Sequence, residues 1–147
     1  MALDKDFKEF LLLLNQHKVK YLVIGGYAVV FYGYVRFTGD VDIWIEASQD
    51  NAENLIKAID AYGFEIDELK KRDFEKDIIM FSMGADLLKI EITNRISGVS
   101  FKDCYPRRRD TEIEGISISF IGLEDLKKNK KWSGRLKDLN DLENLPE

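Results

Sequence analysis

The sequence predicts an α/β (α+β) fold in which helices flank a mixed β-sheet. Segments typical of helices and strands follow in the order helix, strand, helix, strand, helix, then several strands and two helices. The 147 residues suit one compact domain with a single core. The hydrophobic fraction of 45% and the charged fraction of 33% are typical of a globular protein and not of a disordered one. We therefore expect a single domain over residues 1–147, with C-terminal helices at about 122–145 packed onto it.

The N-terminal third of the chain predicts a helix, a strand, a second helix and a second strand. Apolar residues at helical spacing indicate an amphipathic helix that ends near His17, which we interpret as a structural residue. Residues 21–24 form a short β-rich run typical of a buried strand, and residues 27–32 are apolar throughout, which indicates a short buried helix. From Val41 the pattern changes to period two, so residues 40–46 predict a strand with two distinct faces.

The rest of the chain predicts one more helix, two hairpins and a pair of terminal helices. An apolar stripe over residues 48–63 indicates a helix that Ser48 or Asp50 can cap and that Gly63 ends. The charge-rich residues 65–76 predict a loop or a frayed helix. Residues 78–83 and 87–93 predict two strands joined by a turn at Gly84-Ala85. The remaining segments are an irregular connection (94–110), a hairpin or edge strand around Glu114-Gly115, and two helices separated near Gly134 (122–145).

Composition limits the ligands and the location of the protein. Cys104 and His17 are the only residues of their types, which excludes an internal disulfide and a Cys/His metal cluster. A bound metal would therefore need carboxylate ligands, which favours Mg²⁺ or Mn²⁺ over Zn²⁺. The net charge of −5 argues against nucleic-acid binding through a globally basic surface. The apolar run 11–14 is far too short for a membrane span and residues 1–10 lack a signal-peptide core, so we expect a cytoplasmic protein without a membrane partner.

Two carboxylates stand on one face of the predicted strand over residues 40–46. Asp40 and Asp42 are separated by a single residue, so their side chains emerge on the same side. Neighbouring carboxylates repel each other unless a cation lies between them, and together they can share a hard divalent ion. A solvated strand end is the alternative interpretation of an isolated Asp-x-Asp pair.

A third carboxylate, Glu91, strengthens the metal interpretation. It lies between Ile90 and Ile92 on a predicted central strand, where an unpaired charge would be costly. Asp86 is the competing candidate, but it shares the parity of Ile90 toward the presumed core and stands at the start of the strand, which is typical of a turn residue. We therefore predict that Glu91 joins the two aspartates, since three carboxylates suit a site for two ions.

A glycine pair precedes the acidic strand. Gly25-Gly26 lies between the predicted buried strand and the short helix. Glycines at such a junction let the backbone approach a ligand closely, and the N-terminus of a helix favours an anion. An isolated glycine pair would indicate only a tight turn. Its position before the Asp-x-Asp strand favours a phosphate-binding loop.

These motifs together resemble the nucleotidyltransferase superfamily related to DNA polymerase β. Gly25-Gly26, thirteen intervening residues, residues 40–43 and the later Glu91 follow its pattern. Residues 36–42, Arg-Phe-Thr-Gly-Asp-Val-Asp, are similar to the signature of a group of small bacterial and archaeal members that includes abortive-infection toxin-type proteins. Residues 129–139 are similar to that group's C-terminal Asn-Lys…Gly-Arg-x-Lys-Asp-hydrophobic motif. The superfamily often has Gly-Ser at the glycine pair and Asp as the third acid, but neither departure removes a ligand.

The resemblance implies a nucleotidyltransferase-like fold and a role for each motif. Gly25 and Gly26 would hold the phosphates of a nucleoside triphosphate such as ATP. Asp40, Asp42 and Glu91 would bind two Mg²⁺ ions, or Mn²⁺, and Glu91 would help to remove the proton of the acceptor hydroxyl. Attack on the α-phosphate would transfer a nucleoside monophosphate and release pyrophosphate. The acceptor stays open between RNA such as tRNA, a protein and a small molecule.

Several basic residues are predicted to neutralise the triphosphate, because phosphoryl transfer depends on positioning and electrostatic stabilisation. A helix that simply faces water is the alternative, and Lys137 with Asp138 suits the docking of the last helix equally well. The run Arg107–Arg109 could meet an acidic acceptor such as RNA, but a solvated loop is the preferred interpretation. The predicted phosphate-binding residues are Arg36, Lys130, Arg135 and Lys137.

Three other functions share parts of this pattern. A catalytically inactive nucleotide- or partner-binding module, such as one component of a toxin–antitoxin system with a cognate partner protein, has no reason to keep all three acids. A glycosyltransferase uses Asp-x-Asp to bind a sugar nucleotide, but the chain is short for that class. A haloacid-dehalogenase-like phosphatase expects Thr or Val two residues after Asp-x-Asp, where this chain has Trp44.

Overall fold

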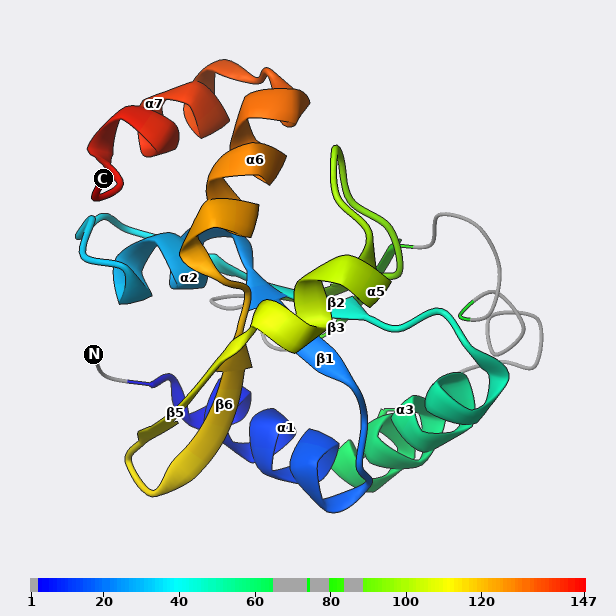
Figure 1. Cartoon of the computed structure of the whole chain (residues 1–147). Helices are drawn as coiled ribbons and strands as arrows, with labels where there is room; N and C mark the ends of the chain where they lie inside the picture. The colour runs from blue at the N-terminus through cyan, green and yellow to red at the C-terminus, as the bar shows by residue number, and fades with distance from the viewer. Residues whose placement is uncertain (1–2, 65–73, 75–79, 84–88) are drawn as a thin grey trace.

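A computed structural model describes residues 3–64, 74, 80–83 and 89–147 of the chain (Figure 1). The described strands form one six-stranded mixed sheet in the order β3-β4-β2-β1-β6-β5. Helices flank this sheet, so the predicted α/β (α+β) class is confirmed. The described elements are α1 (Lys5–Gln16), β1 (Tyr21–Ile24), α2 (Gly25–Phe31), β2 (Asp40–Ile45), α3 (Gln49–Tyr62), β3 (Met80–Met83), β4 (Lys89–Thr93), α5 (Phe101–Cys104), η1 (Tyr105–Arg107), β5 (Arg109–Ile113), β6 (Ile116–Phe120), α6 (Leu123–Ser133) and α7 (Leu136–Asn144).

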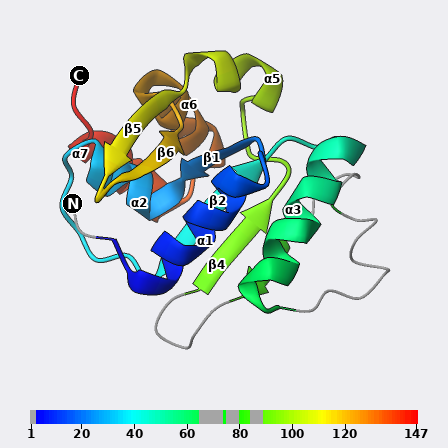
Figure 2. The same ribbon diagram turned by 90° about the horizontal axis from the view of Figure 1, so that it is seen from below.

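The helices cover the sheet from two sides. α1 and α3 pack side by side below the strands, whereas α6 and α7 lie above them (Figures 1 and 2). The spacing of apolar residues in α1 explains its place, because Phe7, Phe10, Leu11 and Leu14 are all fully buried. β1 occupies the middle of the sheet, and all four of its residues are buried, as its continuous apolar sequence predicts.

The pairing of the central strands brings the two acidic segments together. β1 pairs with β2 in antiparallel orientation and with β6 in parallel orientation. On its other side β2 pairs with β4 in parallel orientation, and in this register Asp42 lies opposite Glu91. Segments that are far apart in the sequence therefore become neighbours at the centre of the sheet.

Local signals define most of the element boundaries. The Ser48 side chain accepts a hydrogen bond from the Asn51 backbone N–H at the start of α3, and Gly63 ends that helix in the left-handed conformation. The predicted hairpin between β5 and β6 is confirmed, since Glu114 and Gly115 both have positive φ. α2 begins at Gly25, earlier than the predicted start at residue 27, so the glycine pair lies in its first turn.

The structure corrects the prediction for residues 94–110 and confirms the pairing of β3 with β4. The connection 94–110 is not wholly irregular, because it contains α5, η1 and the first residues of β5. Ser100 caps α5, but a helix of four residues is too short to produce a hydrophobic period. β3 and β4 pair in antiparallel orientation as predicted. The turn at Gly84-Ala85, Asp86 and most of the charge-rich segment 65–76 lie outside the described residues.

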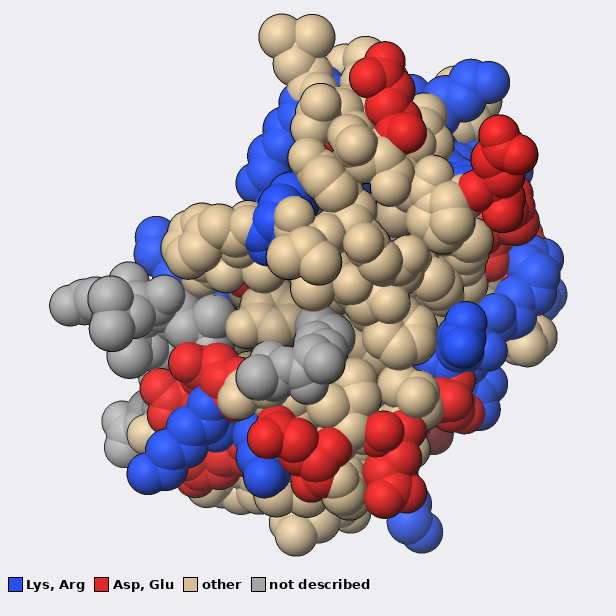
Figure 3. Space-filling view, turned by 90° about the vertical axis from the view of Figure 1, so that its left-hand side faces the viewer, with Lys and Arg blue, Asp and Glu red and all other residues tan. Residues whose placement is uncertain are grey.

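The surface separates charged and uncharged regions. On the side of the molecule seen in Figure 3, the centre carries few charged side chains, whereas charged side chains of both signs lie at the lower end and along the edges. Three apolar residues are largely exposed: Val35 and Phe37 in the segment between α2 and β2, and Leu136 at the start of α7. None of the helices in the described part of the chain is long and apolar enough to cross a membrane.

Candidate active site

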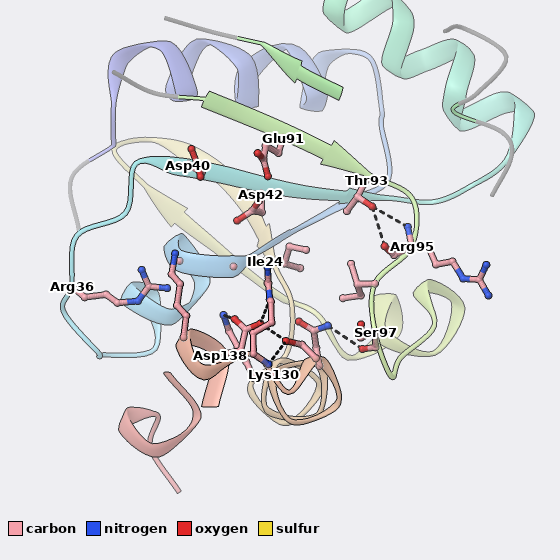
Figure 4. Close-up of a pocket in the computed structure, with 17 residues that line it drawn as sticks. Ile24, Arg36, Asp40, Asp42, Glu91, Thr93, Arg95, Ser97, Lys130 and Asp138 are labelled. Carbon is pink, nitrogen blue, oxygen red and sulfur yellow. Dashed lines mark hydrogen bonds and ion pairs between the residues drawn. The ribbon is translucent and has the colours of Figure 1, made fainter. Parts of the chain in front are cut away.

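All of the residues predicted for the site line one cavity of about 410 Å³ (Figure 4). The junction of β1 and α2 forms one wall, β2 and β4 form a second, and α6 with the start of α7 forms a third. The segment that follows β4 closes the remaining side with Arg95, Ile96 and Ser97. The predicted residues that line the cavity are Gly25, Gly26, Arg36, Asp40, Asp42, Glu91, Lys130, Arg135 and Lys137.

Asp42 and Glu91 form the centre of this cavity. They are paired residues on the parallel strands β2 and β4, and the Glu91 side chain points toward Asp42 (Figure 4). Burial raises the pKa of Asp42 to about 7, and a hydrogen bond with Glu91 and the negative charges of Glu91 and Asp40 contribute to this rise, although Lys130 opposes them. Near neutral pH Asp42 therefore keeps its proton for part of the time, beside Glu91.

The carboxylate chemistry fits a hard divalent cation. A cation between Asp42 and Glu91 would replace the proton that the pair holds, and Mg²⁺ and Mn²⁺ prefer such oxygen ligands. Among the described residues, however, no three His, Cys, Asp or Glu side chains lie close enough together to hold one ion. Asp40 is exposed at the first position of β2, so its carboxylate would have to turn toward the pair. The three-ligand site stays a prediction.

The glycine pair has a direct structural explanation. Gly25 has a φ of +66°, and a Cβ atom there would lie 2.2 Å from Asp42 Oδ2. At Gly26 a Cβ atom would lie 2.4 Å from Thr38 Oγ1, and that hydroxyl donates to the Asp40 carbonyl oxygen at 2.9 Å. The glycines therefore let Asp42 and Thr38 pack against the start of α2. Their predicted role in holding phosphate stays a prediction.

A buried network of ion pairs forms the wall opposite the carboxylates. The Lys130 ammonium is buried and donates to Asp138 at 2.9 Å and to Asp141 at 3.0 Å. The Arg36 guanidinium binds both oxygens of Asp141, each at 2.8 Å. Arg135 Nε and the Ser133 hydroxyl both donate to Asp138. The network joins the segment between α2 and β2 to α6 and α7.

These contacts change the interpretation of the basic residues. Burial opposes ionisation of Asp138, but hydrogen bonds from Ser133, Lys130 and Arg135 lower its pKa to about 2. Burial also opposes ionisation of Asp141, whose pKa is nevertheless lowered by Arg36 and Lys130. The three cations outnumber the two carboxylates, so this wall keeps a net positive charge. Lys130 is shared between two carboxylates, so its geometry favours positioning over direct binding of triphosphate.

Asp141 was not among the residues predicted for the site. A signal was present, because Asp138 and Asp141 share one face of α7 at helical spacing. Their ion pairs with Lys130 show that this face docks the last helix, which agrees with the docking interpretation of Asp138. Lys137 lines the cavity but is exposed, so water and ligands reach it more easily than they reach Lys130.

The run Arg107–Arg109 has partners within the chain. Arg107 binds both oxygens of Asp125, at 2.8 and 3.0 Å. Arg108 lies over the Tyr105 ring at 4.0 Å, and Arg109 lies over the Phe31 ring at 5.4 Å. The prediction of a solvated loop is thus wrong for the backbone, which continues from η1 into β5, and these contacts give no support to an RNA-binding role.

Solved structures of similar fold are nucleotidyltransferase structures. The chain superposes on TM1012, a putative nucleotidyltransferase from Thermotoga maritima, with a TM-score of 0.63 and 17% identity, over 94% of this chain and 88% of the other. It superposes on the lincosamide antibiotic adenylyltransferase LnuA, solved with lincomycin bound, with a TM-score of 0.61 and 17% identity, over 97% of this chain and 96% of the other. At these identities the similarity establishes the fold.

A third structure and a family model extend the comparison. ANT(2″)-Ia, solved in complex with adenylyl-2″-tobramycin, superposes with a TM-score of 0.59 and 12% identity, over 93% of this chain and 83% of the other. No curated protein sequence matches the chain. A sequence model described as "Nucleotidyltransferase of unknown function (DUF6036)" matches residues 1–145.

Proposed function

Because the chain belongs to the DUF6036 family of nucleotidyltransferases, we propose that it transfers a nucleoside monophosphate from a nucleoside triphosphate to an acceptor hydroxyl and depends on Mg²⁺ or Mn²⁺. The observation that carries this proposal is the Asp42–Glu91 pair, which two parallel strands hold opposite a wall of net positive charge. Two neighbouring carboxylates suit a divalent cation, and the basic wall suits the phosphates of the donor.

The residues of the chain divide the reaction between two sides of the cavity. Gly25 and Gly26 would hold the β- and γ-phosphates, and Arg36 would add positive charge from its ion pair with Asp141. The exposed Arg135 and Lys137 would close over the phosphates. A bound divalent cation would supply positive charge to the α-phosphate and its leaving group. The acceptor oxygen would attack the α-phosphorus, the bond to the bridging oxygen would break, and pyrophosphate would leave.

The acceptor proton needs a carboxylate within reach. Glu91 and Asp42 are the carboxylates at the centre of the cavity, and one of them would take the proton as the new phosphorus–oxygen bond forms. The raised pKa of Asp42, about 7, supports a pair that can hold a proton near neutral pH. We assign the proton to Glu91 because it is on β4, beside the segment that closes the far side of the cavity.

Small acceptors are supported by two of the similar folds. LnuA is a lincosamide antibiotic adenylyltransferase, and ANT(2″)-Ia was solved with adenylylated tobramycin. Both structures thus contain a small antibiotic or its adenylylated form. We therefore give small hydroxylated molecules the first place among the acceptors, ahead of tRNA and protein, and take ATP as the first donor to test.

The decisive experiment is transfer of label from α-labelled nucleoside triphosphates. Wild-type protein is incubated with Mg²⁺ and, in separate reactions, with cellular RNA, cellular protein and a small-molecule extract. Asp42→Asn and Glu91→Gln should each lower transfer by about 100-fold or more, whereas the exposed Glu112→Gln on β5 should leave it unchanged. Binding of nucleotide without any transfer would favour an inactive module, such as one component of a toxin–antitoxin system. Absence of metal-dependent nucleotide binding would refute both functions.

A further inference from the structure

A second cavity lies directly beside the candidate active site. It measures about 770 Å³, and the two cavities share the wall formed by Arg95, Ile96 and Ser97. Its other described lining includes Trp44 and Glu46 of the β2 region and Lys102 of α5. A cavity of this volume suits a molecule of drug-like or sugar-like size.

The direction of β2 connects the two cavities. Asp42, Trp44 and Glu46 alternate onto the same face of the strand, so the acidic residues of the first cavity continue into the lining of the second. Trp44 lies opposite Thr93 in the β2–β4 pair, one step beyond the pair of Asp42 and Glu91 on that face. A ligand in the second cavity would therefore lie next to Glu91 and Asp42 along the strands.

The geometry of the proposed reaction agrees with an acceptor in the second cavity. The attacking and leaving oxygens lie on opposite sides of the transferred phosphorus in an in-line displacement. Figure 4 shows Arg36 at one end of the first cavity and Arg95 with Ser97 at the other, with Asp42 and Glu91 between them. If pyrophosphate leaves toward Arg36, the acceptor hydroxyl enters from the end of Arg95, where the second cavity begins.

Trp44, one of the residues that line the second cavity, contains an unsatisfied donor. Trp44 is 1% exposed, and its indole Nε1 has no hydrogen-bond partner within the described part of the chain. A buried N–H group normally has an acceptor, so this orphan is an unusual feature of a residue that lines the cavity. The ring itself is fixed by an edge-to-face contact with Phe101.

The charges of the lining select among acceptors. Lys102 of α5 is exposed at the cavity, and its ammonium contributes positive charge to this lining. Glu46 is the carboxylate of the described lining, and it already accepts from Ser48 at 2.9 Å and lies 3.7 Å from the Lys20 ammonium. This balance disfavours a polycationic molecule and favours an anionic one.

We propose that the second cavity binds the acceptor, and that the acceptor is a small hydroxylated molecule with an anionic group such as a phosphate. This inference rests on the proposed function for its chemistry. The acceptor hydroxyl would lie at Glu91, and the anionic group of the acceptor would face Lys102.

The test measures binding separately from transfer. Trp44 and Trp132 are the two tryptophans, so the ¹⁵N-labelled protein has two indole N–H signals, and Trp132→Phe assigns the one from Trp44. Ribose 5-phosphate, ribose and tobramycin are titrated without nucleotide or metal. Ribose 5-phosphate should shift the Trp44 signal at millimolar concentration, ribose should bind about tenfold more weakly, and tobramycin should have no effect.

A matched pair of charge reversals locates the anionic group. Lys102→Glu should weaken binding of ribose 5-phosphate roughly tenfold, because the variant removes an attraction and adds a repulsion. Lys128→Glu makes the same change on α6 at a residue that lines neither cavity, and it should have no effect. Equal effects of the two variants, or none from Lys102→Glu, would overturn the inference.

Transfer of label then separates the inference from the proposed function. Sugar-phosphate binding without label transfer from any nucleoside triphosphate would refute the proposed function and keep the ligand class of the cavity. Label that passes to tobramycin or to an RNA 3′ end, while sugar phosphates neither bind nor accept it, would keep the function and refute this inference.

Discussion

At the scale of the residue, Asp42 depends on the absence of a side chain at Gly25. The carboxylate lies so close to the backbone that a Cβ atom on residue 25 would stand 2.2 Å from its Oδ2. The same carboxylate is opposite Glu91 across the β2–β4 pair. Gly25 therefore fixes the position of the acid that the proposed chemistry needs most, whether or not its own backbone N–H also binds phosphate.

Gly25→Ala should disturb both stability and the site. The substitution forces a side chain into a left-handed conformation and into the space of Asp42, so we expect a loss of about 2–4 kcal/mol in the free energy of unfolding and a large loss of metal binding. Gly115→Ala is the matched control, since Gly115 also has positive φ but a Cβ atom there would meet no other atom within 4 Å. It should cost about 1 kcal/mol and leave metal binding intact. Urea unfolding and Mn²⁺ titration measure both, and equal costs would contradict the clash.

At the scale of the element, one carboxylate ties three segments together. Asp141 of α7 binds Arg36 from the segment between α2 and β2, and it also binds Lys130 of α6. The Asp141 side chain is 1% exposed and the Lys130 side chain 5% exposed. The last helix is thus attached to the cavity wall through buried charge.

Asp141→Asn should loosen this attachment. Removal of one charge leaves Arg36 and Lys130 with only part of their compensation, so we expect a loss of about 3–5 kcal/mol in the free energy of unfolding. Hydrogen exchange should increase in α7 and residues 34–38 before it increases in α1. Asp110→Asn removes an exposed partner of Arg108 and should cost less than about 1 kcal/mol. A similar small cost for Asp141→Asn would show that the buried network contributes little to stability.

The elements also show what the sequence could predict. Period-two alternation identified β2, and parity selected Glu91 over Asp86, because both depend only on residues adjacent in the chain. The pairing of Asp42 with Glu91 needed the parallel β2–β4 register, which no local pattern specifies. The two carboxylates that bind Lys130 lie on α7, and they reach it only because α7 packs on α6. No local sequence pattern predicts that packing, so the ion pairs of Lys130 were not predicted.

The short helix α5 was not predicted because four residues give no hydrophobic period. The single-domain organisation over residues 1–147 stays a prediction.

At the scale of the whole molecule, the site places opposing demands on stability as pH changes. Asp42 binds its proton more tightly when folded, since its pKa is raised from 3.8 to about 7. Its contribution to stability therefore falls as pH rises through that interval. Asp138 behaves in the opposite way, because its folded pKa is about 2. Its contribution is present above its ordinary pKa of 3.8 and is lost as pH falls toward 2.

The free energy of unfolding should show how much stability the protein loses when Asp42 gives up its proton. Between about pH 4 and pH 7 we expect the metal-free wild type to lose about 2–4 kcal/mol relative to Asp42→Asn, because a tenfold change in proton affinity is worth about 1.4 kcal/mol. Millimolar Mn²⁺ should remove most of this loss in the wild type and none in the variant, since the ion replaces the proton between Asp42 and Glu91. Urea unfolding at each pH, with and without Mn²⁺, measures the difference. Parallel curves for the two proteins would mean that Asp42 and Glu91 do not share a proton, and an Mn²⁺ effect of equal size in both would place the ion elsewhere.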